Sequence, residues 1–119
     1  MSRSGPPTGP GGITPAEAHR LAQGGHALLL DVREPEEYAR EHAPGALLLP
    51  LGQLTPRTRL PRRRTVLAIC RSGNRSLVAA GLLAAHGIDV LDVTGGMRAW
   101  RQAGLPTHSG TGCPCGPAT

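Results

Sequence analysis

The sequence contains no phenylalanine, one tyrosine (Tyr38) and one tryptophan (Trp100). It therefore lacks the aromatic platforms on which bases and sugars stack in many binding proteins. Aliphatic residues and alanine must fill the core, since they make up most of the 39% hydrophobic content. Trp100 is expected to anchor that core and not to bind a ligand.

Long apolar runs are also absent. No stretch approaches the roughly 18 apolar residues of a membrane span, and residues 1–12 contain no apolar segment typical of a secretory signal. The three cysteines, Cys70, Cys113 and Cys115, are an odd number and do not indicate a disulfide framework. We therefore expect a cytoplasmic protein with no membrane partner.

Lysine is absent too, so all 13 basic residues are arginines, and the net charge is +5 at pH 7. Such an excess attracts small anions or nucleic acid. The densest arginine run, residues 57–64, is broken by Pro61 and contains no aromatic residue. These features favour a solvated linker over a nucleic-acid site, and we predict no nucleic-acid partner.

The composition divides the chain into one domain between two polar ends. Residues 1–12 are rich in Pro, Gly and Ser and predict a disordered N-terminal tail. Residues 107–119, with Cys113 and Cys115, predict a flexible C-terminal tail. The remaining segment, residues 13–106, has the length of one ordinary domain.

Apolar runs and helical segments alternate within that domain. Four apolar runs predict strands, several of them buried on both faces: residues 27–32, 46–49, 65–70 and 88–93. Helices are predicted over residues 15–23, 33–40, 76–86 and 97–103. This alternation implies an α/β fold with a mainly parallel sheet and helices on both faces.

Cys70 ends the clearest of these strands, at the sheet edge where parallel α/β sheets bind ligands. The segment CRSGNRS (residues 70–76) joins that strand to a helix N-terminus, where backbone N–H groups and the helix dipole attract anions. The residues predicted to form this anion cradle are Arg71, Ser72, Gly73, Asn74, Arg75 and Ser76. Glycine and asparagine permit a tight curl, the serines supply hydroxyls, and the arginines supply charge. We predict that the cradle favours the Cys70 thiolate and holds a substrate oxyanion beside it. The alternative is an inert buried thiol, which would gain nothing from two flanking arginines.

Three segments in this order resemble the rhodanese family: residues 28–46 (LLLDVREPEEYAREHAPGA), residues 70–76, and residues 91–106 (LDVTGGMRAWRQAGLP). The resemblance implies a doubly wound domain with a five-stranded, mainly parallel sheet, with no cofactor and no metal ion. It also implies a sulfurtransferase. Cys70 would take sulfane sulfur from thiosulfate or a similar donor, hold it as a persulfide and pass it to cyanide, a thiol or a protein acceptor.

Loop length distinguishes this reaction from phosphate chemistry. Cys70 to Arg75 spans six residues, one fewer than in the phosphatases and arsenate reductases that resemble this fold. The shorter loop favours attack on sulfur. A rhodanese fold used only as a binding or regulatory module remains the second hypothesis, but it has no need of a nucleophile such as Cys70.

Asp31 and Arg33 follow the first long strand, at the same edge as Cys70. They either orient the Cys70 loop or belong, with Glu34 and Glu37, to an ion network that ties loops together. The network is the favoured interpretation.

His42 is interpreted as structural, because persulfide transfer from a thiolate needs no general base. Cys113 and Cys115 either accept sulfur from Cys70 or have no role, and both hypotheses stay open.

Overall fold

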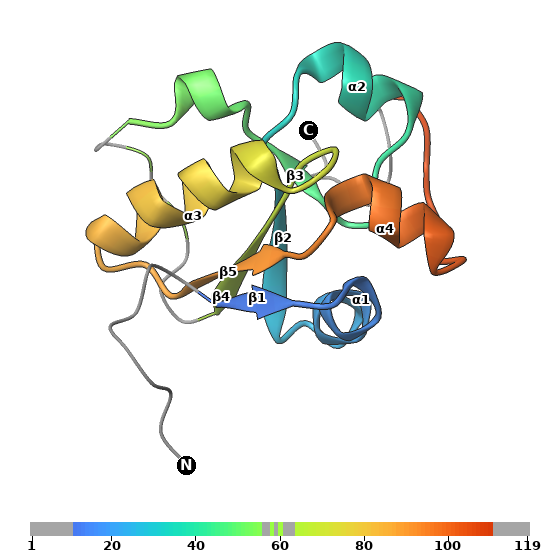
Figure 1. Ribbon diagram of the computed structural model, residues 1–119, viewed down its shortest axis with the longest axis horizontal. Helices are drawn as coiled ribbons and strands as arrows, with labels where there is room; N and C mark the ends of the chain where they lie inside the picture. The colour runs from blue at the N-terminus through green and yellow to red at the C-terminus, as the bar shows by residue number, and fades with distance from the viewer. Residues whose placement is uncertain (1–10, 56–57, 59, 61–63, 111–119) are drawn as a thin grey trace.

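The computed structural model describes residues 11–55, 58, 60 and 64–110 of the chain. Its five strands form one sheet in the order β1-β5-β4-β2-β3, and every pairing is parallel (Figure 1). The strands are β1 (Gly12–Ile13), β2 (Ala27–Asp31), β3 (Leu47–Leu48), β4 (Thr65–Ile69) and β5 (Val90–Val93). The helices are α1 (Pro15–Gln23), α2 (Pro35–Arg40), α3 (Asn74–Ala85) and α4 (Gly96–Gln102), with a 3-10 turn, η1, at Leu51–Gln53.

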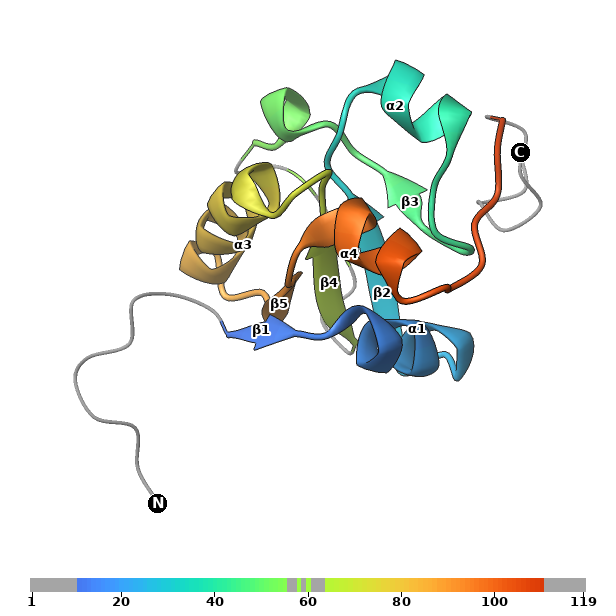
Figure 2. The same ribbon diagram turned by 45° about the vertical axis from the view of Figure 1, so that its right-hand side comes forward.

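Helices cover both faces of the sheet, as the doubly wound class requires. Figure 2 shows α3 on one side and α1 and α4 on the other. The α3 face is filled by small and aliphatic side chains such as Ala79, Ala80 and Val90. The opposite face contains Met97 and Trp100. The α/β fold class predicted from the sequence is confirmed.

Trp100 anchors its face of the core, as predicted. Its side chain is fully buried. Its indole N–H donates a hydrogen bond of 2.8 Å to the carbonyl oxygen of Pro106, so burial leaves no unpaired donor on the ring. This bond also fixes the chain directly after α4.

The folded part extends beyond the predicted boundaries at both ends. Gly12, assigned to the N-terminal tail, pairs with Asp92 in β1. At the other end, His108 exchanges two backbone hydrogen bonds of 2.8 Å with His42, and the Thr107 hydroxyl donates to Glu41. Residues 107–110 therefore belong to the domain and not to a flexible tail. Cys113 and Cys115 lie outside the described residues.

The α3 helix begins two residues earlier than predicted, so Asn74 and Arg75 form its first turn. Asn74 does not adopt a left-handed conformation, because every described residue with positive φ is a glycine. Gly73, with φ of +110°, makes the turn into the helix alone. β1 was missed because two residues are too few to form a pattern.

Two glycines begin α4 and bring it against the end of β4. Gly96 has φ of +58°, in the left-handed region. A Cβ atom there would overlap the carbonyl oxygen of Cys70 and come within 2.8 Å of the Arg71 carbonyl. Both the conformation and the contact therefore require glycine.

We predict that Gly96→Ala lowers the free energy of unfolding by about 2–4 kcal/mol, because it adds a clash with rigid backbone to a strained φ. The control is Gly81→Ala, within α3, where an added Cβ meets nothing within 4 Å. That change should be neutral or stabilise by up to about 1 kcal/mol. Urea denaturation of the two variants measures both values. Equal stabilities would contradict the close contact at Gly96.

Candidate active site

Cys70 lies directly after β4, at the carboxyl edge of the sheet. Its side chain is 1% exposed and packs with the core residues beneath α3. The backbone N–H of Gly73 donates to its Sγ atom at 3.0 Å, and the Ser76 hydroxyl lies 3.2 Å from the same atom. We call residues 70–75 the Cys70 loop. A buried sulfur that faces an amide donor, a hydroxyl and a helix N-terminus is suited to bear negative charge.

The first turn of α4 holds the Cys70 loop from the other side. The backbone N–H of Met97 donates to the carbonyl of Cys70 at 2.7 Å, and that of Arg98 to the carbonyl of Arg71 at 3.0 Å. The sequence analysis did not predict this contact. The sequence did contain a signal for it, because two adjacent glycines at the start of a helix, Gly95 and Gly96, permit a close backbone approach.

Arg75 is bound to a partner on α2. Its guanidinium forms two hydrogen bonds to the Glu37 carboxylate, of 2.7 and 2.9 Å. These bonds lower the pKa of Glu37 from 4.5 to about 2 and raise the pKa of Arg75. The sequence assigned Arg75 to the anion cradle and Glu37 to an ion network. The structure joins the two, so the positive charge of Arg75 is shared with a carboxylate.

Asp31 and Arg33 form a buried ion pair at the end of β2. The guanidinium of Arg33 donates to the two Asp31 oxygens at 2.9 and 2.8 Å, and to the carbonyl of Glu41 at 2.7 Å. Both side chains are at most 5% exposed. These bonds tie the end of β2 to the segment after α2.

The remaining members of the predicted cradle are divided between surface and interior. Arg71, Ser72 and Asn74 are exposed, whereas Gly73 and Ser76 are buried. The Ser76 hydroxyl donates to Asp92 of β5, a residue that sequence reasoning missed. The sequence signal for Asp92 was weak, because it consists of one acidic residue inside an otherwise apolar strand.

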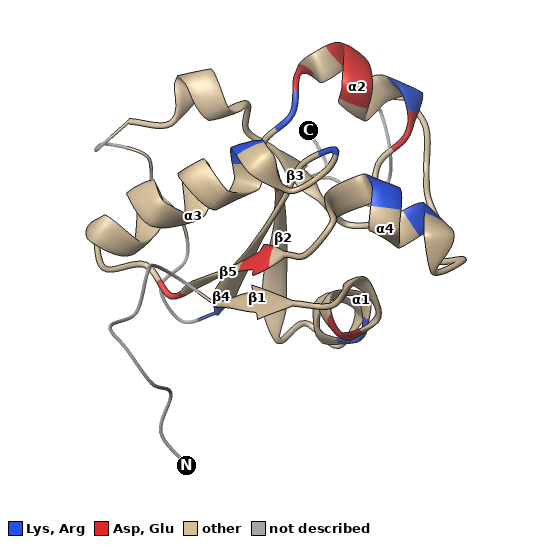
Figure 3. Ribbon diagram, viewed as in Figure 1, with Lys and Arg blue, Asp and Glu red and all other residues tan. Residues whose placement is uncertain are grey.

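A polar cavity of about 310 Å³ opens beside Arg71. Its lining residues are Arg33, Glu37, Arg40, Glu41, Arg71 and Arg101. Figure 3 shows how charged residues gather around α2, α4 and the start of α3.

Three arginines in or beside the cavity have carboxylate partners: Arg33 binds Asp31, Arg75 binds Glu37, and Arg101 binds Glu41 at 2.7 Å. Within the described residues, Arg40 and Arg71 form no ion pair. The cavity therefore has a surplus of two positive charges, which suits a small dianion.

The family model of the rhodanese-like domain matches residues 14–103, which include every part of this site. The chain belongs to the rhodanese family. It is 41% identical over 91 residues to a protein of Allochromatium vinosum named sulfurtransferase, covering 75% of this chain and 85% of that one. It is 34% identical over 116 residues to the chloroplastic thiosulfate sulfurtransferase 16 of Arabidopsis thaliana, covering 84% of this chain and 94% of that one.

Other relatives of this rhodanese domain are longer. An uncharacterized protein of Synechocystis sp. is 41% identical over 98 residues, and the match covers 80% of this chain but only 54% of the relative.

Among solved structures, a rhodanese-related protein from Thermoplasma volcanium superposes with a TM-score of 0.74 at 30% identity, covering 82% of this chain and 97% of that one.

The described residues contain neither a metal-binding cluster nor a membrane-spanning helix. No group of three or more His, Cys, Asp or Glu side chains in this part of the rhodanese domain could hold a metal ion. None of its helices is long and apolar enough to cross a bilayer.

The Glu37–Arg75 pair gives a pH-dependent contribution to stability. Because the pKa of Glu37 is lower in the folded state than its ordinary value of 4.5, the pair stabilises the fold above about pH 4.5. That contribution is lost as the pH falls toward 2. We predict that Glu37→Gln lowers the free energy of unfolding by about 1 kcal/mol at pH 7, since the pair is partly exposed.

The difference between wild type and Glu37→Gln should shrink as the pH is lowered from 5 to about 3, measured by urea denaturation at each pH. Glu36→Gln is the matched control, because Glu36 lies on the same helix and is exposed. A difference that does not change with pH would contradict the assignment of the low pKa to Glu37.

Proposed function

We propose that this rhodanese domain is a sulfurtransferase that carries sulfane sulfur as a persulfide on Cys70. The observation that supports this most is the position of the Cys70 sulfur, 3.0 Å from the Gly73 amide at the start of α3. An amide donor and a helix N-terminus stabilise a thiolate. The names of the Allochromatium and Arabidopsis relatives support the same reaction class.

The proposed reaction has two displacement steps. First, the Cys70 thiolate attacks the outer sulfur of thiosulfate; the sulfur–sulfur bond of the donor breaks, and its electron pair leaves with sulfite. Second, a thiolate or cyanide attacks the outer sulfur of the Cys70 persulfide, and the Cys70 thiolate leaves with the bonding pair. Cys70 is thiolate before and after the cycle, so no cofactor enters the balance.

Thiosulfate as the donor fits the charge around the loop. It is a small dianion, and Arg40 and Arg71 supply two positive charges without carboxylate partners in the described structure. In this proposal Arg71 guides the anion to the loop, and amides of the first turn of α3 bind its oxygens. Arg75 has a different part, because its bonds to Glu37 fix the beginning of α3.

The alternatives from the sequence are less well supported. A binding or regulatory module has no use for a thiol held against an amide donor. A phosphatase needs a wider hollow than the six-residue Cys70 loop supplies. Transfer of sulfur to Cys113 or Cys115, a cytoplasmic location and the absence of a nucleic-acid partner stay predictions.

We predict that Cys70→Ser abolishes thiosulfate:cyanide sulfurtransfer, because the hydroxyl of serine is a far weaker nucleophile toward sulfur. Thiocyanate formation measures the activity, and urea denaturation verifies that the variant is folded. Turnover in the folded variant above one hundredth of the wild-type rate would move the chemistry to another residue.

Arg71→Gln should raise KM for thiosulfate by about fivefold and change kcat less, since the charge acts on the approaching anion. Arg64→Gln is the control, because Arg64 is also exposed and directly precedes β4, and its substitution removes the same charge. If KM for thiosulfate rises by the same factor in both variants, the overall positive charge of the protein, and not Arg71 in particular, attracts the donor.

A further inference from the structure

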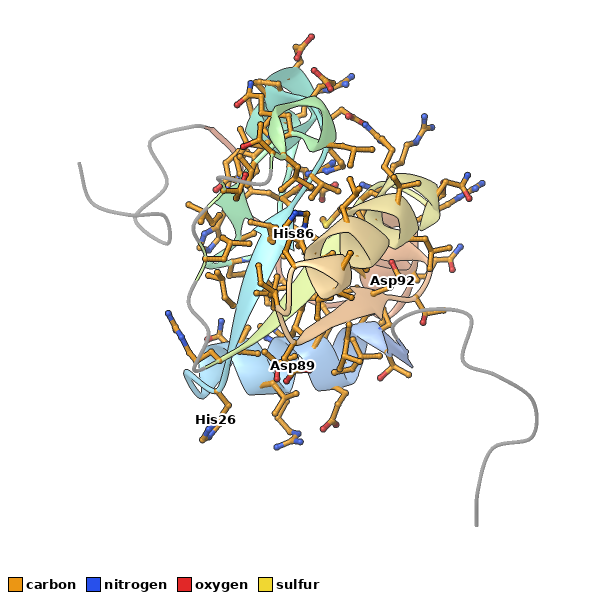
Figure 4. The ribbon with its side chains drawn as sticks, turned by 90° about the vertical axis from the view of Figure 1, so that its left-hand side faces the viewer. His26, His86, Asp89 and Asp92 are labelled. Atoms are coloured by element: carbon orange, nitrogen blue, oxygen red, sulfur yellow. The ribbon has the colours of Figure 1, made fainter. Side chains whose placement is uncertain are left out.

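A chain of hydrogen bonds runs from Cys70 into the sheet. The Sγ atom of Cys70 lies 3.2 Å from the Ser76 hydroxyl, which is also hydrogen-bonded to the carboxylate of Asp92. All three side chains are at most 5% exposed. Figure 4 shows Asp92 beside α3, and Asp89 away from it near the start of β5. The proposed two-step reaction does not use Asp92.

The single proton of the Ser76 hydroxyl permits two arrangements of this chain. With Cys70 as a thiol, S–H donates to Ser76, and the Ser76 O–H donates to the Asp92 carboxylate. With Cys70 as a thiolate, the protonated carboxyl of Asp92 donates to Ser76, and the Ser76 O–H donates to sulfur. The arrangements differ by one proton moved from Cys70 to Ser76 as another moves from Ser76 to Asp92. The negative charge passes from oxygen to sulfur, and no proton enters or leaves.

We propose that Asp92 is a positioning residue that takes the thiol proton of Cys70 through Ser76, so that the two buried groups share one proton. The inference rests on the proposed function only in taking Cys70 as the nucleophile. Two anions in this buried environment would repel each other strongly, so one proton shared between them is the favoured state near neutral pH.

The surroundings of Asp92 favour a carboxylate that accepts a proton. Burial raises its pKa, and the hydrogen bond from Ser76 opposes that effect only in part. The neighbouring strands place uncharged residues opposite it in register, Gly12 of β1 and Ala68 of β4.

The Cys70 loop itself carries two charged side chains, those of Arg71 and Arg75. Arg75, in the first turn of α3, interacts with Cys70 electrostatically and is paired with Glu37 of α2. Arg71 follows Cys70 in the loop, with an exposed side chain. On the sulfur side, the Gly73 amide stabilises the thiolate that remains when Asp92 takes the proton.

The test is the rate at which iodoacetamide alkylates Cys70 in the full chain, measured from about pH 4 to about pH 10. The rate is followed by mass spectrometry on the Cys70 peptide, because Cys113 and Cys115 react as well. If two groups share one proton, the wild-type rate rises in two steps separated by more than about one pH unit. A single step in the wild type overturns the proposal without any variant.

Asp92→Asn keeps the shape of the side chain and removes its titration. As a mimic of the protonated carboxyl, this variant should show one step, with a midpoint between the two steps of the wild type. Asp89→Asn, which removes an exposed carboxylate just before the same strand, should keep both steps. Two unchanged steps in Asp92→Asn would assign the second group to another residue.

The alkylation assay uses no sulfur donor, so its failure can be told apart from failure of the proposed function. A two-step profile without persulfide formation would contradict the proposed sulfurtransferase function and support the proton shared by Cys70 and Asp92. A one-step profile with persulfide on Cys70 would do the reverse.

Discussion

The backbone contact between α4 and the Cys70 loop is the constraint on which the site depends. Met97 and Arg98 donate to the carbonyls of Cys70 and Arg71, and Gly96 makes this approach sterically feasible. With the carbonyl of Cys70 held from the α4 side, the chain turns at Gly73 into α3. That turn brings the Gly73 amide and the Ser76 hydroxyl to the sulfur. The Cys70 sulfur is thus positioned by contacts from α3 and α4.

The charged groups around the Cys70 loop are of two kinds, paired and unpaired. Some acidic and basic groups form ion pairs: Asp31 with Arg33, and Glu37 with Arg75. At the surface, Arg40 and Arg71 carry charge that no described carboxylate neutralises. The Asp31–Arg33 pair is buried, where an unpaired charge would destabilise the fold. The partly exposed Glu37–Arg75 pair joins α2 to α3. The unpaired charges of Arg40 and Arg71 remain available to a bound anion.

The sequence was sufficient to predict the α/β class, the position of Cys70 and the loop around it, because strong apolar periodicity and a polar strand-to-helix segment are local signals. It could not predict the pairing of Arg75 with Glu37, because those residues are 38 positions apart and meet only when α2 and α3 pack at the same sheet edge. The contact from Asp92 to Ser76 was missed for the same reason.

The ends of the domain show a different limit. β1 is two residues long, and residues 107–110 contain glycine and serine that resemble a tail. Both segments are fixed by backbone hydrogen bonds to distant partners, Asp92 and His42. Backbone hydrogen bonds of this kind produce no pattern in the side chains, so composition assigned Gly12 and residues 107–110 to the tails.

The proposed function requires that Cys70 carries the transferred sulfur. The most direct measurement is intact-mass spectrometry of the protein after incubation with thiosulfate, followed by digestion to find the modified residue. If Cys70 carries the sulfur, the Cys70 peptide of the wild type gains one sulfur atom, and Cys70→Ser gains none anywhere. An unchanged mass in the wild type, or sulfur gained by folded Cys70→Ser, would contradict it.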